Sequence, residues 1–163
     1  MSRAFVKEDG PDNTPLPDLP LGTHPNYVTP RGIDALRARL AAVHAELTRL
    51  KSRPDRLDTL PERAAERDIR YLEARLRSAI VVDPAYQPRD EVAFGARIEV
   101  ADDDANTETY EITGEDEADA SLGRIAPHSP LARALLGARI GDIVEWRRPI
   151  GLRTLEIMAI RYF

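Results

Sequence analysis

The stretch His128-Ser-Pro-Leu-Ala-Arg-Ala-Leu-Leu-Gly-Ala-Arg-Ile-Gly-Asp-Ile-Val-Glu-Trp146 predicts a short capped helix, a tight exit and a strand. Ser129 is suited to accept a backbone N–H as the helix N-cap, and Pro130 suits the first helical position. Gly141 with Asp142 can reverse the chain into a segment whose β-branched residues favour a strand. Periodicity alone indicates only a generic connection from helix to strand in an α+β domain.

The exact order of residues in this stretch indicates more than its periodicity does. Ser-Pro-Leu-Ala-Arg-Ala-Leu-Leu-Gly followed by Gly-Asp resembles the signature in the C-terminal domain of the bacterial GreA/GreB elongation factors. The segment 92–100 resembles the strand that opens that domain, and 155–162 resembles its closing strand. The resemblance implies a small FKBP-like antiparallel β domain with one short helix over residues 83–163, without prolyl isomerase activity. The expected strands are 92–100, 107–113, 122–126, 142–147 and 153–162, with one helix at 130–136.

Two upstream segments carry the clearest periodic signal. Apolar residues recur at spacings of three and four in a first run, Ile33, Leu36, Leu40, Val43, Leu47 and Leu50, and in a second run, Ala65, Ile69, Leu72, Leu76 and Ala79. This spacing predicts an amphipathic helix from Pro30 to Ser52 and a second helix capped by Asp58 or Thr59, with Pro61 in its first turn.

Two such seams joined by a short turn predict an antiparallel α-helical coiled-coil hairpin over residues 28–82. On heptads alone, a dimerising coiled coil or a fragment of a bundle is the commoner outcome. The order of parts, a hairpin followed by a Gre-like domain, favours the hairpin. The predicted fold class is therefore α+β, with the hairpin first and the small β domain second.

Residues 1–27 are predicted to form a flexible Pro-rich tail. They carry prolines at positions 11, 15, 17, 20 and 25 among polar residues, which leaves little apolar surface to offset the cost of ordering. The pair Phe5-Val6 allows an alternative in which the tail contains a docking peptide for a partner.

Charge and composition restrict the class of partner. Residues 30–80 carry 12 Lys and Arg against 8 Asp and Glu, whereas residues 81–163 carry 9 against 16. An acidic C-terminal domain argues against non-specific binding of duplex DNA and favours a protein partner. The chain has no cysteine, which excludes disulfides, thiolate zinc sites and cysteine nucleophiles. No long apolar run or signal-peptide pattern is present, so we expect no membrane association and a cytoplasmic location.

The acidic loops do not predict a stable metal site. The segment 102–106 resembles the start of a calcium loop, but Thr107 stands where glycine is needed and Thr113 where a bidentate Glu is needed. It is interpreted as a hairpin turn, and residues 115–119 as a solvated charged loop. The three histidines share no ligand spacing, and no P-loop, Rossmann glycine pattern or nucleophile elbow is present. Enzymatic activity of the chain itself is not expected.

The resemblance implies instead that the chain assists a reaction catalysed by its partner. In Gre factors the hairpin enters the secondary channel of RNA polymerase, where two acids at its tip help to hold a second Mg²⁺ and to cleave backtracked RNA. RNA polymerase, bound at the rim of this channel, is therefore the expected partner, with indirect contact to the 3′ end of the nascent RNA. We expect no cofactor of the chain's own, only the Mg²⁺ of the polymerase active site, and at most stimulation of the polymerase's intrinsic cleavage.

The tip sequence departs from the family pattern. Typical Gre tips have an Asp, two intervening residues and then Glu-Asn-Ala, whereas this chain has Asp58-Thr-Leu-Pro-Glu62-Arg-Ala-Ala. Asp58 and Glu62 are the nearest pair and the candidate assisting residues, but helix capping explains the same carboxylates. The predicted arm is also shorter than the usual Gre arm, and four arginines surround the tip, at positions 53, 56, 63 and 67.

The family's second contact lies in the C-terminal domain, which docks at the channel rim through the loop that enters the short helix. Carried over, this places polymerase-binding residues at Ser129, Pro130 and Arg133, with Pro127 and His128 in the approach. Two alternatives stay open. One is a regulator that occupies the channel without promoting cleavage, as Rnk-type proteins and some Gre homologues do. The other is a dimeric coiled-coil scaffold with no polymerase partner, which sedimentation would separate from the expected monomer.

Overall fold

The computed structural model describes residues 13–163, so Phe5 and Val6 lie outside the described residues. The chain divides into two compact units. The first, here called the helical unit, comprises the described residues up to Leu21 together with Arg37–Arg77. The second, the sheet unit, comprises Gly22–Leu36 and Ser78–Phe163. Among the described residues, no helix is long and apolar enough to cross a membrane.

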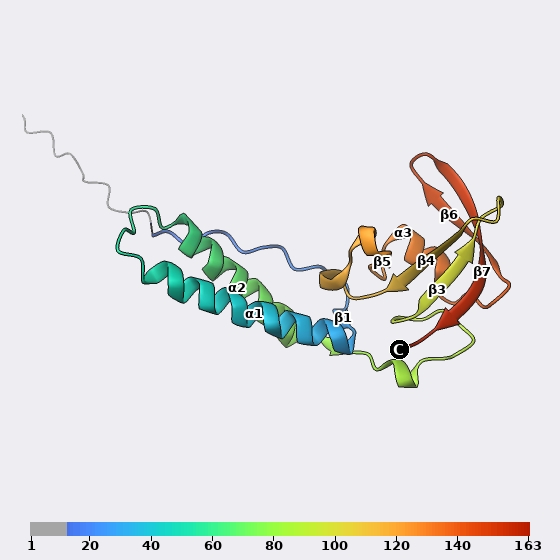
Figure 1. Ribbon diagram of the computed structural model, residues 1–163, viewed down its shortest axis with the longest axis horizontal. Helices are drawn as coiled ribbons and strands as arrows, with labels where there is room; N and C mark the ends of the chain where they lie inside the picture. Colours follow the sequence, from blue (N-terminus) through green and yellow to red (C-terminus); the bar gives the residue numbers. More distant parts are fainter. Residues whose placement is uncertain (1–12) are drawn as a thin grey trace, which may run out of the picture. The chain divides into compact units, whose positions relative to one another are not determined.

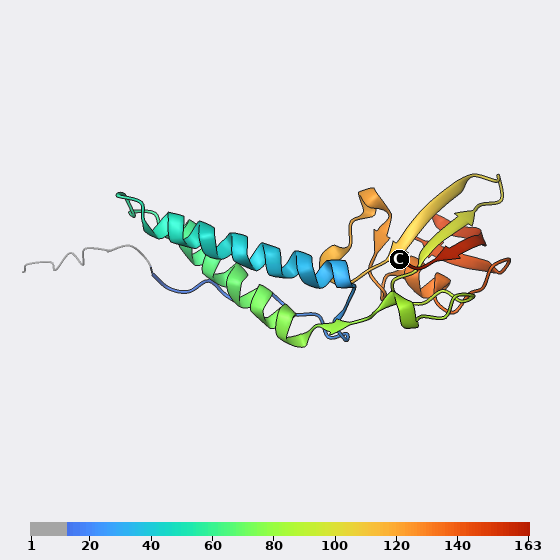
Figure 2. The ribbon, with the colours of Figure 1, turned by 60° about the horizontal axis from the view of Figure 1, so that its bottom comes forward.

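Two helices with opposite directions form the body of the helical unit. They are α1 (Pro30–Lys51) and α2 (Leu60–Ser78), and Figures 1 and 2 both show them side by side. In α2 the predicted seam residues Ala65, Ile69 and Leu72 are buried. Leu72 is fully excluded from solvent. Both helices were predicted, and α1 ends one residue earlier than expected.

The described part of the N-terminal segment is tied to α2. The guanidinium of Arg63 donates to the carbonyl of Thr14 at 2.9 Å, and Arg70 donates to the carbonyl of Leu16 at 2.8 Å and to the carboxylate of Asp18 at 2.6 Å. We call residues 14–21 the strap. Proline has no backbone N–H, so the strap offers few donors to its own carbonyl oxygens. Arginines of α2 donate to these oxygens instead.

A five-stranded sheet forms the body of the sheet unit (Figure 1). The strands are β3 (Arg97–Ala101), β4 (Thr107–Ile112), β5 (Arg124–Ile125), β6 (Ile143–Arg148) and β7 (Gly151–Arg161), in the order β5-β4-β3-β7-β6. All neighbours are antiparallel except β4 and β5, which are parallel. The prediction of a purely antiparallel sheet is therefore wrong at this edge. Two 3-10 turns, at Glu115–Glu117 and Ala120–Leu122, bring the chain back so that β5 runs in the direction of β4.

The opening strand begins later than its sequence predicts. Residues 92–96 were expected to be extended, but β3 starts at Arg97. Gly95 has a φ of 87° and lies in a turn in which the Ala96 N–H bonds to the Ala93 carbonyl at 3.1 Å. Glycine adopts this left-handed conformation at little steric cost, so the turn forms inside an otherwise apolar run.

The core of the sheet unit lies between the sheet and α3 (Pro130–Leu135). Alternate residues of β3 and β7 are buried, as half-buried strands require. Helix α3 contributes Leu131, Ala132 and Leu135 to the same cluster. The short helix is therefore fixed to the sheet by its apolar face, and its N-terminus is held at a defined place.

A second, small ladder holds the start of α1. Strand β1 (Tyr27–Val28) pairs in parallel with β2 (Ile80–Val81), and Thr29 follows as the cap of α1. The Thr29 hydroxyl accepts the Gly32 N–H at 2.9 Å and donates to the Glu117 carboxylate at 2.6 Å. The side chain of Glu117 is only 7% exposed. The interpretation of residues 115–119 as a solvated loop is thus wrong for Glu117, which is a buried acceptor.

Candidate functional site

The loop between α1 and α2, residues 52–59, is the first candidate site, and we call it the tip loop. Asp55 accepts the Leu57 N–H at 3.0 Å, and Asp58 accepts the Leu60 N–H at 2.9 Å. Arg53 donates to the carbonyl of Asp58 at 3.1 Å. Side chains of Asp that bond a backbone N–H two residues on are typical of tight turns. The acids of the loop therefore shape its backbone.

Glu62, in the first turn of α2, is held by arginines of the tip loop. Nε and Nη2 of Arg56 donate to its two carboxylate oxygens at 3.0 and 2.5 Å, and Arg53 lies 3.7 Å away. The side chain of Glu62 is 5% exposed. The hydrogen bond from Arg56 holds the pKa of Glu62 below its ordinary value, against the burial that would raise it. The same bond raises the pKa of Arg56.

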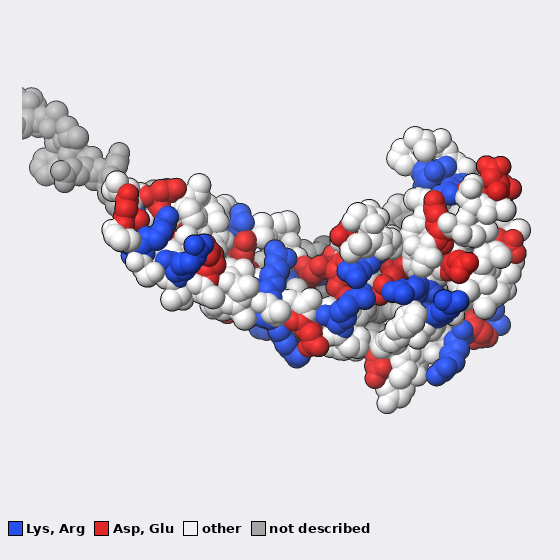
Figure 3. Space-filling model, viewed as in Figure 1, with Lys and Arg blue, Asp and Glu red and all other residues white. Residues whose placement is uncertain are grey.

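The predicted pair Asp58 and Glu62 is therefore not a ready ligand set for Mg²⁺. Carboxylate oxygens are the hard donors that Mg²⁺ prefers, and Asp58 is exposed. Both oxygens of Glu62, however, already accept from Arg56. The next acid of α2, Glu66, pairs with Lys51 at 2.8 Å. Figure 3 shows acidic and basic side chains intermixed at this end of the helical unit.

Arg56 is the functional candidate that sequence reasoning missed. It appeared in the sequence only as one of four arginines that make the tip basic. Its separation of six residues from Glu62 matches neither spacing at which side chains meet on a helix, three or four residues. The pair forms only because the tip loop folds back on α2, so helical periodicity contains no signal for it.

The second candidate site is the N-terminus of α3, where all five residues predicted to bind polymerase lie close in sequence and structure. Ser129 is the N-cap and its hydroxyl accepts the Ala132 N–H at 3.3 Å. Pro130 and Arg133 are exposed. Nδ1 of His128 lies 3.3 Å from the Glu115 carboxylate, so this approach residue is held in place.

Two hollows border this helix terminus. One, of about 260 Å³, is lined by the predicted residues Pro127, His128 and Arg133 and by His24 and Tyr27 from the segment before α1. The rings of His24 and His128 stack with centroids 4.6 Å apart. Sequence reasoning missed His24 and Tyr27 because they belong to the segment interpreted as a flexible tail.

The other hollow is an apolar groove of about 440 Å³. Ser129, Pro130 and Leu131 line one part of it, and Tyr110 and Trp146 line another. The two aromatic rings meet edge to face at 6.4 Å. An exposed apolar groove beside a helix terminus is a surface suited to contact with another protein.

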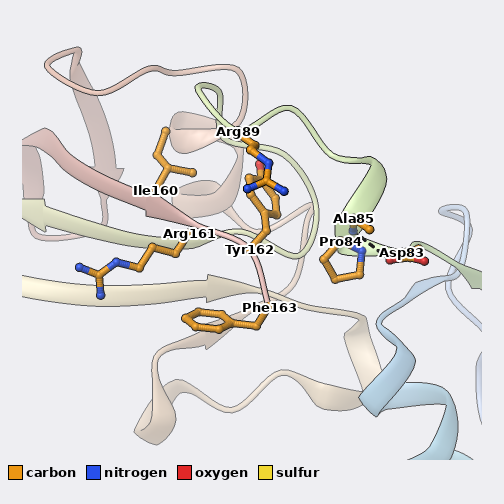
Figure 4. Close-up of a pocket in the computed structure, with 8 residues that line it drawn as sticks. All are labelled: Asp83, Pro84, Ala85, Arg89, Ile160, Arg161, Tyr162 and Phe163. Atoms are coloured by element: carbon orange, nitrogen blue, oxygen red, sulfur yellow. Dashed lines mark hydrogen bonds between the residues drawn. The ribbon is translucent and has the colours of Figure 1, made fainter.

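A further hollow, of about 490 Å³, lies at the end of β7 (Figure 4). The hydroxyl of Tyr162 donates to the Glu91 carbonyl at 2.6 Å and accepts the Ala93 N–H at 2.8 Å, so it is fully engaged. Arg89 and Arg161 are exposed at its edge. Its lining contains no nucleophile paired with a base. Across residues 13–163, no three His, Asp or Glu side chains are grouped to hold a metal ion.

Comparison with known proteins gives a consistent set of relatives. Residues 87–162 match the family model described as "Transcription elongation factor, GreA/GreB, C-term". The transcription elongation factor GreB of Neisseria meningitidis serogroup B is 35% identical over 153 residues, covering 84% of this chain and 94% of the relative. GreA of Alkalilimnicola ehrlichii is 44% identical over 96 residues, covering 58% of this chain and 61% of GreA. A solved GreA/GreB structure from Nitrosomonas europaea is 23% identical, with coverages of 83% and 98% and a TM-score of 0.43. The matches to curated GreA proteins thus span about three fifths of their length.

Proposed function

The chain belongs to the GreA/GreB family of transcription elongation factors, and on this premise we propose that it binds RNA polymerase and modulates elongation through the secondary channel. The proposal is carried by one observation, the order of parts. Two helices joined by an acid-bearing loop precede a domain that matches the family model. The tip loop is then the part that enters the channel and approaches the 3′ end of the RNA, and the chain acts in the cytoplasm.

The proposed contact with the rim of the channel is made by the N-terminus of α3. Ser129, Pro130 and Arg133 supply it, with Pro127 and His128 in the approach. The exposure of Pro130 and Arg133 supports this, as does the apolar groove beside them. The core residues of α3 hold the helix on the sheet, so these side chains are presented on a rigid element.

The chain is proposed to act on the polymerase's own chemistry. Any Mg²⁺ involved belongs to the active site of the polymerase, and the chain holds none by itself. At most the chain stimulates the RNA cleavage that the polymerase performs. We further propose that the helical unit is a coiled-coil hairpin and that the sheet unit is an FKBP-like domain, as the family resemblance implies.

A second candidate within the same setting is a regulator that occupies the channel without stimulating cleavage. The closed pair of Arg56 and Glu62 favours it, because one of the two candidate carboxylates is unavailable in this state. The scaffold alternative has less support. Ala65, Ile69 and Leu72 are already buried within one chain, which leaves little of the α2 seam for a second copy.

Binding and cleavage test the proposal separately. Because the chain has no cysteine, a single introduced cysteine gives one fluorescent label for anisotropy titration with RNA polymerase elongation complexes. We expect saturable binding that Arg133→Glu weakens strongly. Arg161→Glu is the matched control, because it makes the same charge change at an exposed arginine of β7. The absence of binding by the unaltered chain would contradict the proposal.

Cleavage is then measured on backtracked complexes at equal occupancy. Stimulated cleavage that is lost in Asp58→Ala/Glu62→Ala, with binding intact, would support a cleavage factor. Binding without stimulated cleavage would support the channel-occupying regulator.

A further inference from the structure

Glu62 is the most completely buried acid of the tip region. The whole residue is 4% exposed, whereas Asp55 and Asp58 are exposed and accept backbone N–H groups of the tip loop. A carboxylate taken out of water needs compensation by charge and hydrogen bonds. The two-pronged contact from Arg56 supplies both, and its geometry is the strong form of an Arg–carboxylate pair.

The two side chains of this pair differ in their exposure, and the difference decides which of them can leave the pair. The side chain of Arg56 is 47% exposed, while that of Glu62 is 5% exposed. The arginine can leave the pair and remain hydrated, but the carboxylate cannot become available to a metal until the arginine leaves. Arg56 therefore controls the access of any cation to Glu62.

We propose that Arg56 is a positioning residue that holds Glu62 in a closed pair and so biases the tip toward occupying the polymerase channel rather than stimulating RNA cleavage. This inference rests on the proposed function, because it concerns the action of the same tip loop. It also assigns distinct roles to the two candidate acids. Asp58 remains available at the surface, and Glu62 becomes available only when Arg56 is displaced.

The first test is made on the free protein. Carboxyl-carbon NMR across an acid titration reports the pKa of Glu62. In the unaltered chain we expect this pKa below its ordinary value, and in Arg56→Gln we expect it to rise. Arg53 remains 3.7 Å away and should keep part of the shift. Arg56→Lys retains the charge but not the two-pronged geometry, so its value should lie between the two.

The matched control is Arg67→Gln. Arg67 also lies near the tip and pairs with a carboxylate, but its partner is Asp68 at 2.8 Å. Its replacement should leave the pKa of Glu62 unchanged. Equal pKa values of Glu62 in the unaltered chain and in Arg56→Gln would overturn the inference without any use of the polymerase. Circular dichroism of α1 and α2 establishes that each variant keeps its helices.

The second test measures cleavage of backtracked RNA at equal occupancy of the polymerase. Arg56→Gln should cleave several-fold faster than the unaltered chain, and Arg56→Gln/Glu62→Gln should lose that gain. Arg67→Gln should match the unaltered chain. A rate in Arg56→Gln that is no higher, with binding intact, would overturn the role of Arg56 and leave the proposed polymerase binding standing. If the unaltered chain does not bind the polymerase at all, the proposed function itself fails, which the titration detects independently.

Discussion

Ser129 combines a structural role with a proposed binding role. As the N-cap it satisfies the Ala132 N–H, and its own carbonyl accepts the Arg133 N–H at 2.9 Å. It also lies between the hollow at His128 and the apolar groove at Pro130. A local sequence signal predicted this cap, because capping depends on neighbours within one turn. The pairing of Arg56 with Glu62 had no such signal, since it depends on the path of the tip loop.

Replacement of Ser129 tests its role as the N-cap of α3. Ser129→Ala should lower the free energy of unfolding by about 1 kcal/mol, because the Ala132 N–H loses its acceptor. Ser129→Asp should keep most of the stability, since Asp is an equally good cap. Urea denaturation followed by circular dichroism measures both. If Ser129→Ala proves as stable as the unaltered chain, the cap contributes nothing and the account of α3 is incorrect at this residue.

Tyr110 provides a prediction at alkaline pH. Burial, followed by its hydrogen bond to Glu108, raises the pKa of Tyr110 to about 12. A raised pKa means that the folded state favours the neutral phenol. Its contribution to stability is therefore present below the ordinary pKa of 10 and is lost as the pH rises toward 12. The pKa of Tyr162 is also raised by burial, so ultraviolet absorbance should show both of these tyrosines titrating late. The part that titrates near pH 12 should vanish in Tyr110→Phe. A Tyr110 that titrates near pH 10 would contradict this.

Among the elements, the helices followed most directly from the sequence, since their apolar spacing reports burial on one face. The parallel pairing of β4 and β5 could not be predicted in this way. It depends on two 3-10 turns whose geometry is not periodic, and β5 has only two residues. The strap was also missed, because its composition is typical of flexible segments and its partners lie some 50 residues away on α2.

The strap should depend on Arg70. Arg70→Ala removes the contacts to Leu16 and Asp18, which we expect to contribute about 1 kcal/mol or less, as for exposed ion pairs. A fluorophore on Asn13→Cys should then show lower anisotropy, since the segment moves more freely. Arg49→Ala is the control, because Arg49 pairs with Glu46 of the same helix, α1, at 2.6 Å. Equal anisotropy in the Arg70→Ala and Arg49→Ala backgrounds would show that the strap does not rely on Arg70.

At the scale of the whole molecule, we expect each chain to fold without a second copy. The seam of α2 is buried within one chain, and the sheet unit has its own core. Sedimentation equilibrium should therefore give the mass of a single chain, 18.2 kDa, at all accessible concentrations. A mass that rises toward twice this value with concentration would favour the coiled-coil scaffold.

Photocrosslinking from the tip loop shows whether this loop works inside the secondary channel. Leu57 is 84% exposed, so a photoreactive benzoylphenylalanine in its place should not disturb packing. In a stalled elongation complex, we expect crosslinks to polymerase residues that line the secondary channel or to the 3′ end of the RNA, and excess unlabelled protein should reduce them. Crosslinks confined to the outer surface of the polymerase, or none while binding persists, would contradict this expectation.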